Sequence, residues 1–278
     1  MQPHPSDAKG RPLSDSRYNN YLRNVQYATP DNLNARILLH AKYATSSVGW
    51  WEWLHGQIEW AGVHDVLDVG CGTGAFWSSL PHPLGEARVV LADLSRAMLE
   101  LATGAADQQV AHVSGVEANV QSLPFDDESF DVVIANQMLY HATSPDQAVK
   151  EIRRVLRPHG TLMASTIGPA HLHELFDIEQ SIFLVPRQRI LGDIFGPVSG
   201  LAALRQHFAS TEWRSFDDSL RCTDVDDVVS YMTSTPPGDR ATPEQLVDLR
   251  EETQRRMDAG GGVLTVTKET GVFLARCA

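Results

Sequence analysis

The chain has 278 residues, of which 42% are hydrophobic and 21% charged, as expected for one large or two small globular domains. The formal net charge of −12 argues against nucleic acid as a partner, because binding phosphates requires a basic surface. The sequence contains no apolar run of membrane-spanning length and no secretory signal, and its three cysteines are too scattered for a disulfide framework. We therefore expect a reduced, cytoplasmic protein that does not enter membranes.

The predicted elements begin after a polar segment, residues 1–16, which we expect to be a disordered tail. Residues 17–60 are predicted to form an N-terminal helical cover. Within it, "DNLNARILLHAKYA" has apolar residues at helical spacing, with Asp31 after Pro30 as its N-cap. The stretch "GWWEWLHGQIEW" predicts a second, aromatic-rich helix.

Short apolar runs then alternate with helical or turn-like stretches over residues 61–167. The runs are "DVLDVG" (65–70), "ARVVLA" (87–92), "FDVVIAN" (130–136) and "GTLMAST" (160–166). The clearest helix is "SPDQAVKEIRRVLRPHG", with Pro145 near its first turn and Pro158 and Gly160 ending it. Continuous apolar strands between helices predict a parallel sheet that is covered on both faces.

Residues 168–278 are predicted to hold the remainder of the sheet and a substrate-binding lid, at about 168–197 and 223–259. We expect an edge strand in "TEWRSFDDSLRC", two helices within 224–258, and an antiparallel pair across a turn in "GVLTVTKETGVFLARC". Residues 169–260 carry nine Lys/Arg and sixteen Asp/Glu, hence 9 − 16 = −7. This charge favours a neutral, apolar or cationic acceptor over a polyanion.

The stretch "DVLDVGCGTGAFW" places Gly70, Gly72 and Gly74 directly after the first strand, where a ligand contacts the main chain of an open parallel sheet. The same loop satisfies the dinucleotide fingerprint, and Asp93 after the second strand suits the ribose of NAD. Asp68 at the strand tip would repel a pyrophosphate, but it suits a ligand with an ammonium group. S-adenosylmethionine (SAM) has an ammonium, a sulfonium and no phosphate.

Four segments, in this order and spacing, resemble class I SAM-dependent methyltransferases that act on small molecules, of the bacterial natural-product type. They are "VLDVGCGTGAFW", "VVLADLSRAMLELA", "SLPFDDESFDVVIANQMLYH" and "EIRRVLRPHGTLMAS". The resemblance implies an α/β, Rossmann-like fold. Its seven-stranded sheet would be mostly parallel, with an antiparallel final strand, an N-terminal helical cover and a helical lid insertion.

The resemblance also implies a set of cofactor-binding residues: Tyr21, Asp68, Gly70, Cys71, Gly72, Asp93, Leu94, Asn119, Val120 and Asn136. The backbone of the glycine loop, with Asp68, would face the methionine part, as would Asn136. Asp93 would accept both ribose hydroxyls, and Leu94 would cover the adenine with help from Met98. Asn119 stands where the family usually has an acid for the adenine amino group, with the Val120 amide as second contact. Each of three residues has a purely structural alternative. Asp68 could brace the glycine turn, Asn119 could be a turn residue, and Asn136 could satisfy the end of a strand.

Methyl transfer needs alignment first, and a base only if the acceptor must lose a proton early. His141 is our leading base, with Tyr140, His171 and His173 as other candidates, and a structural role for His141 is the alternative. "HLH" at 171–173 lacks further ligands, so we predict no metal site. By the resemblance, Tyr18 or Tyr21 on a predicted N-terminal helix would close over SAM. Tyr21 is our choice, and a plain surface helix is the alternative. If this segment docks on a neighbouring subunit, a homo-oligomer would complete the site.

A cluster of aromatic residues suggests a second hypothesis, about the atom that is methylated. The cluster consists of Tyr43, Trp50, Trp51, Trp53 and Trp60. C-methylation of a prenyl or indole-type substrate would leave a carbocation, which could then cyclise, and aromatic faces stabilise such a cation. Reactions of this kind belong to antibiotic or other secondary-metabolite biosynthesis. The alternative is that these tryptophans pack the cover on the sheet. The sequence leaves three alternative functions. The leading one is a methyltransferase with S-adenosylhomocysteine as product, and the others are a nicotinamide oxidoreductase and a non-catalytic SAM-binding protein.

Overall fold

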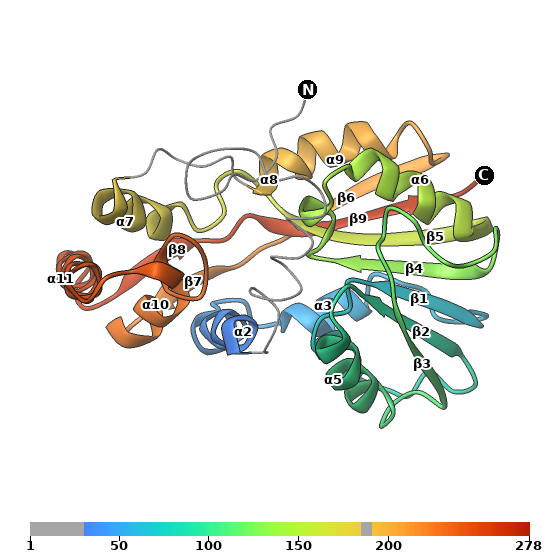
Figure 1. Cartoon of the computed structure of the whole chain (residues 1–278), viewed down its shortest axis with the longest axis horizontal. Coiled ribbons are helices and arrows are strands. Elements are labelled where there is room, and N and C mark those ends of the chain that lie inside the picture. Colours follow the sequence, from blue (N-terminus) through green and yellow to red (C-terminus); the bar gives the residue numbers. More distant parts are fainter. Residues whose placement is uncertain (1–30, 185–190) are drawn as a thin grey trace.

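The computed structural model describes residues 31–184 and 191–278. They form two lobes, a sheet lobe and a smaller helical lobe at its far end, which we call the distal lobe (Figure 1). No helix in these two ranges is both long and apolar enough to cross a bilayer.

The sheet lobe is built on seven strands in the order β3-β2-β1-β4-β5-β9-β6. Their bounds are β1 Asp65–Val69, β2 Arg88–Asp93, β3 His112–Glu117, β4 Phe130–Asn136, β5 Leu156–Ile167, β6 Ser210–Phe216 and β9 Thr270–Arg276. Strands β1 to β5 pair in parallel, whereas β9 runs antiparallel to both of its neighbours, β5 and β6. The predicted mostly parallel, seven-stranded sheet with an antiparallel final strand is confirmed.

Helices cover both faces of this sheet (Figure 1). On one face lie α3 (Trp50–His55), α4 (Ala75–Ser78) and α5 (Arg96–Ala106). On the other lie α6 (Pro145–Val155), α8 (Leu191–Ile194), α9 (Pro197–Leu204) and the 3-10 helix η2 (Leu139–His141). Side chains of β1 alternate between the two cores, because Val66 packs with Leu54 and Phe76 whereas Leu67 packs with Ile152.

The distal lobe combines a two-stranded antiparallel sheet, β7 (Ser219–Cys222) and β8 (Leu264–Thr267), with four helices. These are α2 (Asp31–Tyr43), α7 (His173–Phe183), α10 (Val225–Met232) and α11 (Pro243–Ala259). The 3-10 helix η3 (Gly238–Arg240) joins the last two. An apolar core of its own holds the lobe together, with Leu39 of α2, Ile178 of α7 and Leu249 of α11 among its buried residues.

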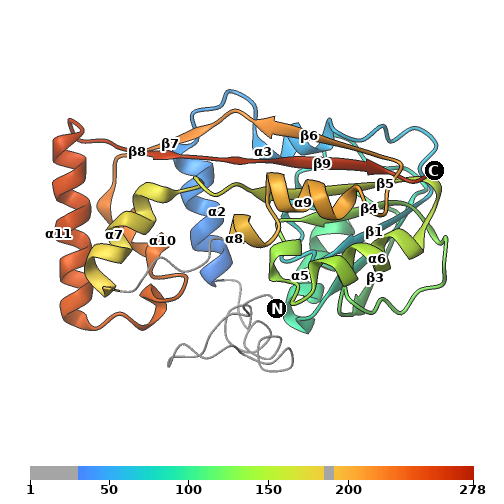
Figure 2. The ribbon, with the colours of Figure 1, turned by 90° about the horizontal axis from the view of Figure 1, so that it is seen from above.

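Two strands of the large sheet continue into the distal lobe (Figure 2). Strand β6 leads into β7, and β8 leads into β9, with only a short break in each run. The predicted pairing across the turn in "GVLTVTKETGVFLARC" is therefore wrong: β8 pairs with β7, and β9 pairs with β5 and β6. The turn is a junction between two sheets, because both strands find partners far along the chain.

The junction is fixed by Asp218, whose side chain is 1% exposed. Its Oδ1 atom accepts backbone N–H bonds from Thr45 at 2.8 Å, Ser46 at 2.9 Å and Ser219 at 2.8 Å. Its Oδ2 atom forms an ion pair with Lys268, which is also buried. This one carboxylate therefore ties together three of the segments that pass between the lobes.

Candidate functional site

The glycine loop joins β1 to α4 and has left-handed backbone at Gly70, Gly72 and Gly74, with φ of 66°, 55° and 76°. A Cβ atom on Gly70 would lie 2.8 Å from the Met138 side chain, so the loop is closely packed as well as strained for other residues. The Gly70 N–H donates to the Ala92 carbonyl at 2.7 Å, which anchors the loop to β2. The predicted bare turn is thus present at the carboxyl edge of the sheet.

Asp93 ends β2 beside this loop and is half-buried. Its Oδ2 atom accepts the Gly72 N–H at 3.0 Å and its Oδ1 atom the Ser95 N–H at 2.8 Å. Burial raises the pKa of Asp93 above its usual value, although these N–H bonds and one from Leu94 oppose the change. Each carboxylate oxygen keeps a lone pair for a ligand hydroxyl.

Asp68 lies in β1 and is almost fully buried, at 2% exposed. Its Oδ2 atom accepts the Trp77 indole N–H at 2.7 Å, whereas its buried Oδ1 atom has no hydrogen-bond partner among the residues that the structure describes. Burial raises the pKa of Asp68 to about 7, against the Trp77 hydrogen bond and with a contribution from Asp93. A buried carboxylate with a spare oxygen suits a cationic ligand group.

Four more residues belong to the predicted site for the methyl donor, which we call the donor site. They are Cys71, Leu94, Asn119 and Val120. Burial and the two nearby carboxylates raise the pKa of the Cys71 thiol well above its usual value, so it stays protonated. Leu94 is half-buried and therefore retains surface for a ligand. Asn119 Oδ1 accepts the Gln121 N–H at 2.9 Å, which gives it the turn role named as its alternative. Val120 is 8% exposed.

Asn136 ends β4, and its Oδ1 atom accepts a hydrogen bond from the Ser165 hydroxyl at the neighbouring position of β5. Asp68, Asp93 and Asn136 lie near the carboxyl ends of the adjacent strands β1, β2 and β4, so the parallel register brings them to one edge of the sheet. Met98 is 1% exposed and belongs to the core. Tyr21 lies outside the described residues.

His141 ends η2, just beyond Asn136 on β4. Burial, with the Arg36 guanidinium as second cause, lowers the pKa of His141 to about 3. The imidazole is therefore neutral at pH 7, but it holds a proton weakly. Nearby, the Tyr140 hydroxyl donates to Gln137 Oε1 at 3.1 Å, and Gln137 Nε2 donates to Thr270 Oγ1 at 3.2 Å.

The two histidines of the "HLH" motif have separate surroundings. His171 is buried, and its Nδ1 atom accepts the Glu269 N–H at 3.2 Å, whereas His173 Nδ1 lies 3.1 Å from the Ala170 carbonyl. His171 also stacks on His40 of α2, with ring centroids 5.9 Å apart. Within the described part of the chain, no three potential ligands come together as a metal site.

The aromatic residues are mostly structural. Trp50 and Trp53 stack at 5.5 Å and both contact Phe216, and the Trp60 indole donates to the His55 carbonyl at 3.1 Å. The four tryptophans 50, 51, 53 and 60 pack against the core that α3, α4 and α5 form with the sheet. Tyr43 instead donates its hydroxyl to Asp227 of α10 at 2.6 Å. The packing alternative therefore accounts for the tryptophans.

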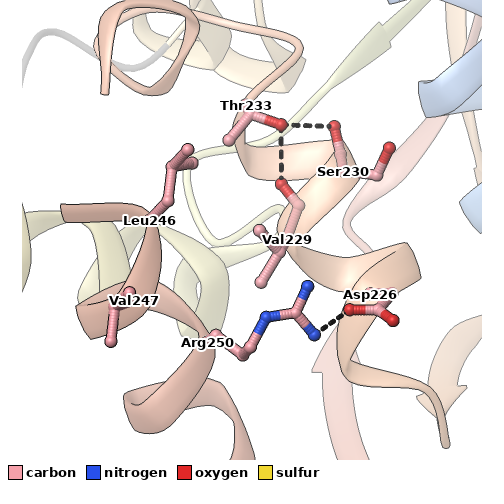
Figure 3. A pocket seen from close by; sticks show the side chains of 7 residues that line it. All are labelled: Asp226, Val229, Ser230, Thr233, Leu246, Val247 and Arg250. Atoms are coloured by element: carbon pink, nitrogen blue, oxygen red, sulfur yellow. Dashed lines mark hydrogen bonds and ion pairs between the residues drawn. The ribbon is translucent and has the colours of Figure 1, made fainter. Parts of the chain in front are cut away.

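A separate surface hollow lies between α10 and α11 in the distal lobe (Figure 3). It is lined by Asp226, Val229, Ser230, Thr233, Leu246, Val247 and Arg250. Arg250 and Asp226 form an ion pair across it. No residue of the glycine loop contributes to this hollow, so it is distinct from the donor site.

Several contacts of the donor site were not predicted: Trp77 with Asp68, Met138 with Gly70 and Ser165 with Asn136. Trp77 was present in the quoted motif, and an indole nine residues after a buried acid was the one available signal. The residues fit SAM, because the bare loop admits close backbone contact, Asp93 has room for hydroxyls and the Asp68 Oδ1 atom needs a cation. The carboxylates of Asp68 and Asp93, when ionised, would repel a phosphate placed beside them.

Comparison with known proteins agrees with this geometry. Residues 67–164 match a family model described as a methyltransferase domain. The chain is 38% identical over 116 residues to a malonyl-acyl-carrier-protein O-methyltransferase from Methylovorus sp. strain MP688, covering 40% of this chain and 39% of the relative. It is 37% identical over 117 residues to a ubiquinone/menaquinone biosynthesis C-methyltransferase from Haemophilus ducreyi, covering 40% and 45%.

Solved structures extend the likeness in fold. The (4+2)-cyclase SpnF superposes with a TM-score of 0.54 at 18% identity, covering 99% of both chains. A phosphoethanolamine N-methyltransferase from Haemonchus contortus, solved with S-adenosylhomocysteine, superposes with a TM-score of 0.53 at 17% identity, covering 95% of this chain and 60% of that one.

Strand order, glycine loop and strand-end acids together define a SAM-binding α/β fold. Residues 67–164 form a methyltransferase domain, and over this part the chain is similar to class I SAM-dependent methyltransferases. It spans about two fifths of the length of the curated relatives it matches.

Proposed function

We propose that this protein is an enzyme that transfers a methyl group from SAM to a small, largely apolar metabolite. The observation that carries the proposal is the pairing of the Gly72 N–H with Asp93, beside a buried Asp68 that has an unused oxygen. SAM, when bound, supplies a methyl group made electrophilic by its sulfonium. The chain's own residues bind the nucleoside, orient it and exclude water.

In this proposal the distal lobe binds the methyl acceptor. The family match ends at residue 164, before α7, and the two curated relatives methylate oxygen and carbon respectively by their names. The lobe has an apolar core and the charge of residues 169–260 is −7, from nine Lys/Arg and sixteen Asp/Glu. These features support a neutral or cationic, mostly apolar acceptor of the kind found in secondary metabolism.

The low pKa of His141 bears on the atom that is methylated. An imidazole with a pKa of about 3 is a poor acceptor for a proton that must leave before attack. This supports an acceptor that needs no strong base, such as the carbon of a prenyl or indole group, with cyclisation able to follow. Transfer to oxygen or nitrogen with His141 as base is the alternative, in which the bound acceptor would have to raise this pKa.

Two measurements test the proposal. Calorimetric titration with S-adenosylhomocysteine and with NADP should show micromolar-range binding of the first only; the reverse preference would replace the methyltransferase by an oxidoreductase. Incubation with labelled SAM and a panel of prenylated indoles, phenols and amines, followed by mass spectrometry, identifies the methylated atom. Binding without transfer to any acceptor class would favour a non-catalytic SAM-binding protein.

We also propose that Tyr21 closes over SAM and that the N-terminal segment takes part in a homo-oligomer. Deletion of residues 1–28 should then weaken S-adenosylhomocysteine binding and reduce the mass measured by light scattering. Tyr21→Phe removes one hydroxyl and leaves the segment in place, so it should weaken binding less than the deletion and leave the measured mass unchanged. An unchanged affinity in the deletion variant would rule out this role.

A further inference from the structure

We propose that Trp77 is a positioning residue for the cofactor's ammonium group, because its indole N–H holds one oxygen of the Asp68 carboxylate and leaves the other for the cation. The inference rests on the proposed function and adds to it a residue that follows the three glycines of the loop. The bond from Trp77 Nε1 to Asp68 Oδ2 measures 2.7 Å, and Oδ1 is buried with no partner among the described residues.

The surroundings of Trp77 make this contact rigid. The side chain is 0% exposed, and its ring lies edge-on to Phe76 with centroids 5.2 Å apart. Helix α4, which carries both rings, has Gly74 as its N-cap, and a Cβ atom on Gly74 would lie 2.7 Å from Ala102 of α5. The donor is therefore fixed by packing before any ligand arrives.

The charges around Asp68 explain why a cation is required. Asp93 on β2 and Cys71 in the loop are the other titratable groups here, and an ionised Asp93 disfavours a second negative charge. His55 of α3 lies against Phe76, with Nε2 2.9 Å from the Phe76 carbonyl, and burial lowers its pKa to about 4, so it is uncharged at pH 7. The ligand's ammonium is the missing positive charge.

Binding should consequently be linked to a proton. Since the pKa of Asp68 is about 7 in the free protein, close to half of the molecules hold this proton at pH 7. An ammonium beside the carboxylate lowers that pKa, and the proton passes to solvent. We expect release of about 0.5 proton per ligand at pH 7, and an affinity roughly fivefold to tenfold weaker at pH 6.0 than at pH 7.5.

The test is calorimetric titration with S-adenosylhomocysteine from pH 5.5 to 7.5, in buffers that differ in ionisation enthalpy. Trp77→Phe keeps an aromatic ring but removes the only described donor to Asp68, so the pKa of the acid rises and the whole affinity profile moves to higher pH. Trp60→Phe is the matched control. Trp60→Phe also removes an indole N–H in the same core, but that N–H donates to the His55 carbonyl and not to Asp68. Its profile of affinity against pH should therefore keep the wild-type midpoint.

Asp68→Asn is the second variant. An amide does not titrate, so the proton release should vanish and the affinity should be weaker but independent of pH. If the wild type binds S-adenosylhomocysteine without releasing a proton, or if Trp77→Phe binds with an unmoved midpoint, the positioning role is wrong while the proposed function stands. If the wild type does not bind at all, the proposed function itself fails. Should Trp77→Phe not fold, the wild-type and Asp68→Asn profiles decide.

Discussion

Asp93 and Gly72 are joined by a hydrogen bond of 3.0 Å from the backbone N–H of the glycine to the carboxylate of the acid. They lie 21 residues apart, at the ends of neighbouring strands, and the bond connects the group expected to hold the ribose with the loop expected to hold the methionine part. The two halves of the donor site are therefore fixed to each other without a ligand.

Asp93→Ala should weaken S-adenosylhomocysteine binding at least about a hundredfold. The loss combines two charge-assisted hydrogen bonds to the ribose, each worth about 1.5–3 kcal/mol, with release of the loop. Asp93→Asn keeps one acceptor oxygen and should fall between the alanine variant and the wild type. Calorimetric titration measures all three, and an alanine variant with wild-type affinity would remove the central assignment of the donor site.

Gly74→Ala should destabilise the fold by about 3 kcal/mol, since it adds a steric clash to a left-handed conformation. The new Cβ atom would lie 2.7 Å from the Ala102 Cα atom, with φ at 76°. Gly85→Ala is the control, because φ is 66° there and nothing lies within 4 Å of the added atom. It should cost only the conformational part, about 1 kcal/mol. Urea denaturation would contradict this account if the two variants were equally stable.

Asp218→Ala should cost about 3–5 kcal/mol of folding stability, because it leaves Lys268 buried without its partner. It also frees the backbone N–H groups of Thr45 and Ser46. Hydrogen exchange should therefore rise at these two amides, as urea denaturation shows the loss of stability. Replacing both members, as in Asp218→Asn with Lys268→Met, should cost less than the single alanine change. Equal costs would show that the ion pair is not what holds the junction.

Glu179→Gln should stabilise the protein at neutral pH. Glu179 is 6% exposed on α7, and burial raises its pKa to about 8. A raised folded-state pKa means stability that is present below pH 4.5 and is lost as the pH rises toward 8. At pH 7 the wild type therefore carries a penalty of about 3 kcal/mol, and at pH 5 less than about 1 kcal/mol.

Thermal or urea unfolding at these two pH values checks the Glu179 prediction. The glutamine variant should exceed the wild type clearly at pH 7 and barely at pH 5. Asp177→Asn, which makes the same change of carboxyl to amide at an exposed position of the same helix, is the matched control. A glutamine variant with the same advantage at both pH values would point to packing and not to ionisation.

The sequence was most informative where the apolar runs are continuous. Strands β1, β2 and β4 were predicted within one residue of their observed bounds, because a strand buried on both faces leaves an unbroken apolar run. Strand β5 begins at Leu156, four residues before the predicted run, in a stretch that was assigned to the end of the preceding helix. Strand β3 (His112–Glu117) lies at an edge, and its residues are only partly buried or exposed, so it left no such run. Edge strands are specified mainly by their neighbour.

The remaining differences arise from contacts between distant segments. The pair "GVLTVTKETGVFLARC" has the local pattern of a hairpin, but its two strands join different sheets. The pKa of His141 depends on its burial and on Arg36, which is 105 residues earlier in the chain and on a helix of the other lobe. The motif predicted that His141 follows the fourth strand, as it does, whereas the proton affinity of His141 is a property of the assembled fold.

Because β8 leads into β9, the distal lobe is connected to one half of the large sheet and not to the other. Strand β9 is wedged between β5 and β6, so the distal lobe is rooted inside the sheet and cannot separate from it as an independent module. The glycine loop and its acids occupy strands β1 and β2, three and four positions away across the sheet from that root. If the distal lobe binds the acceptor as proposed, substitutions in it would reshape the acceptor site and leave the geometry of the glycine loop and its acids unchanged.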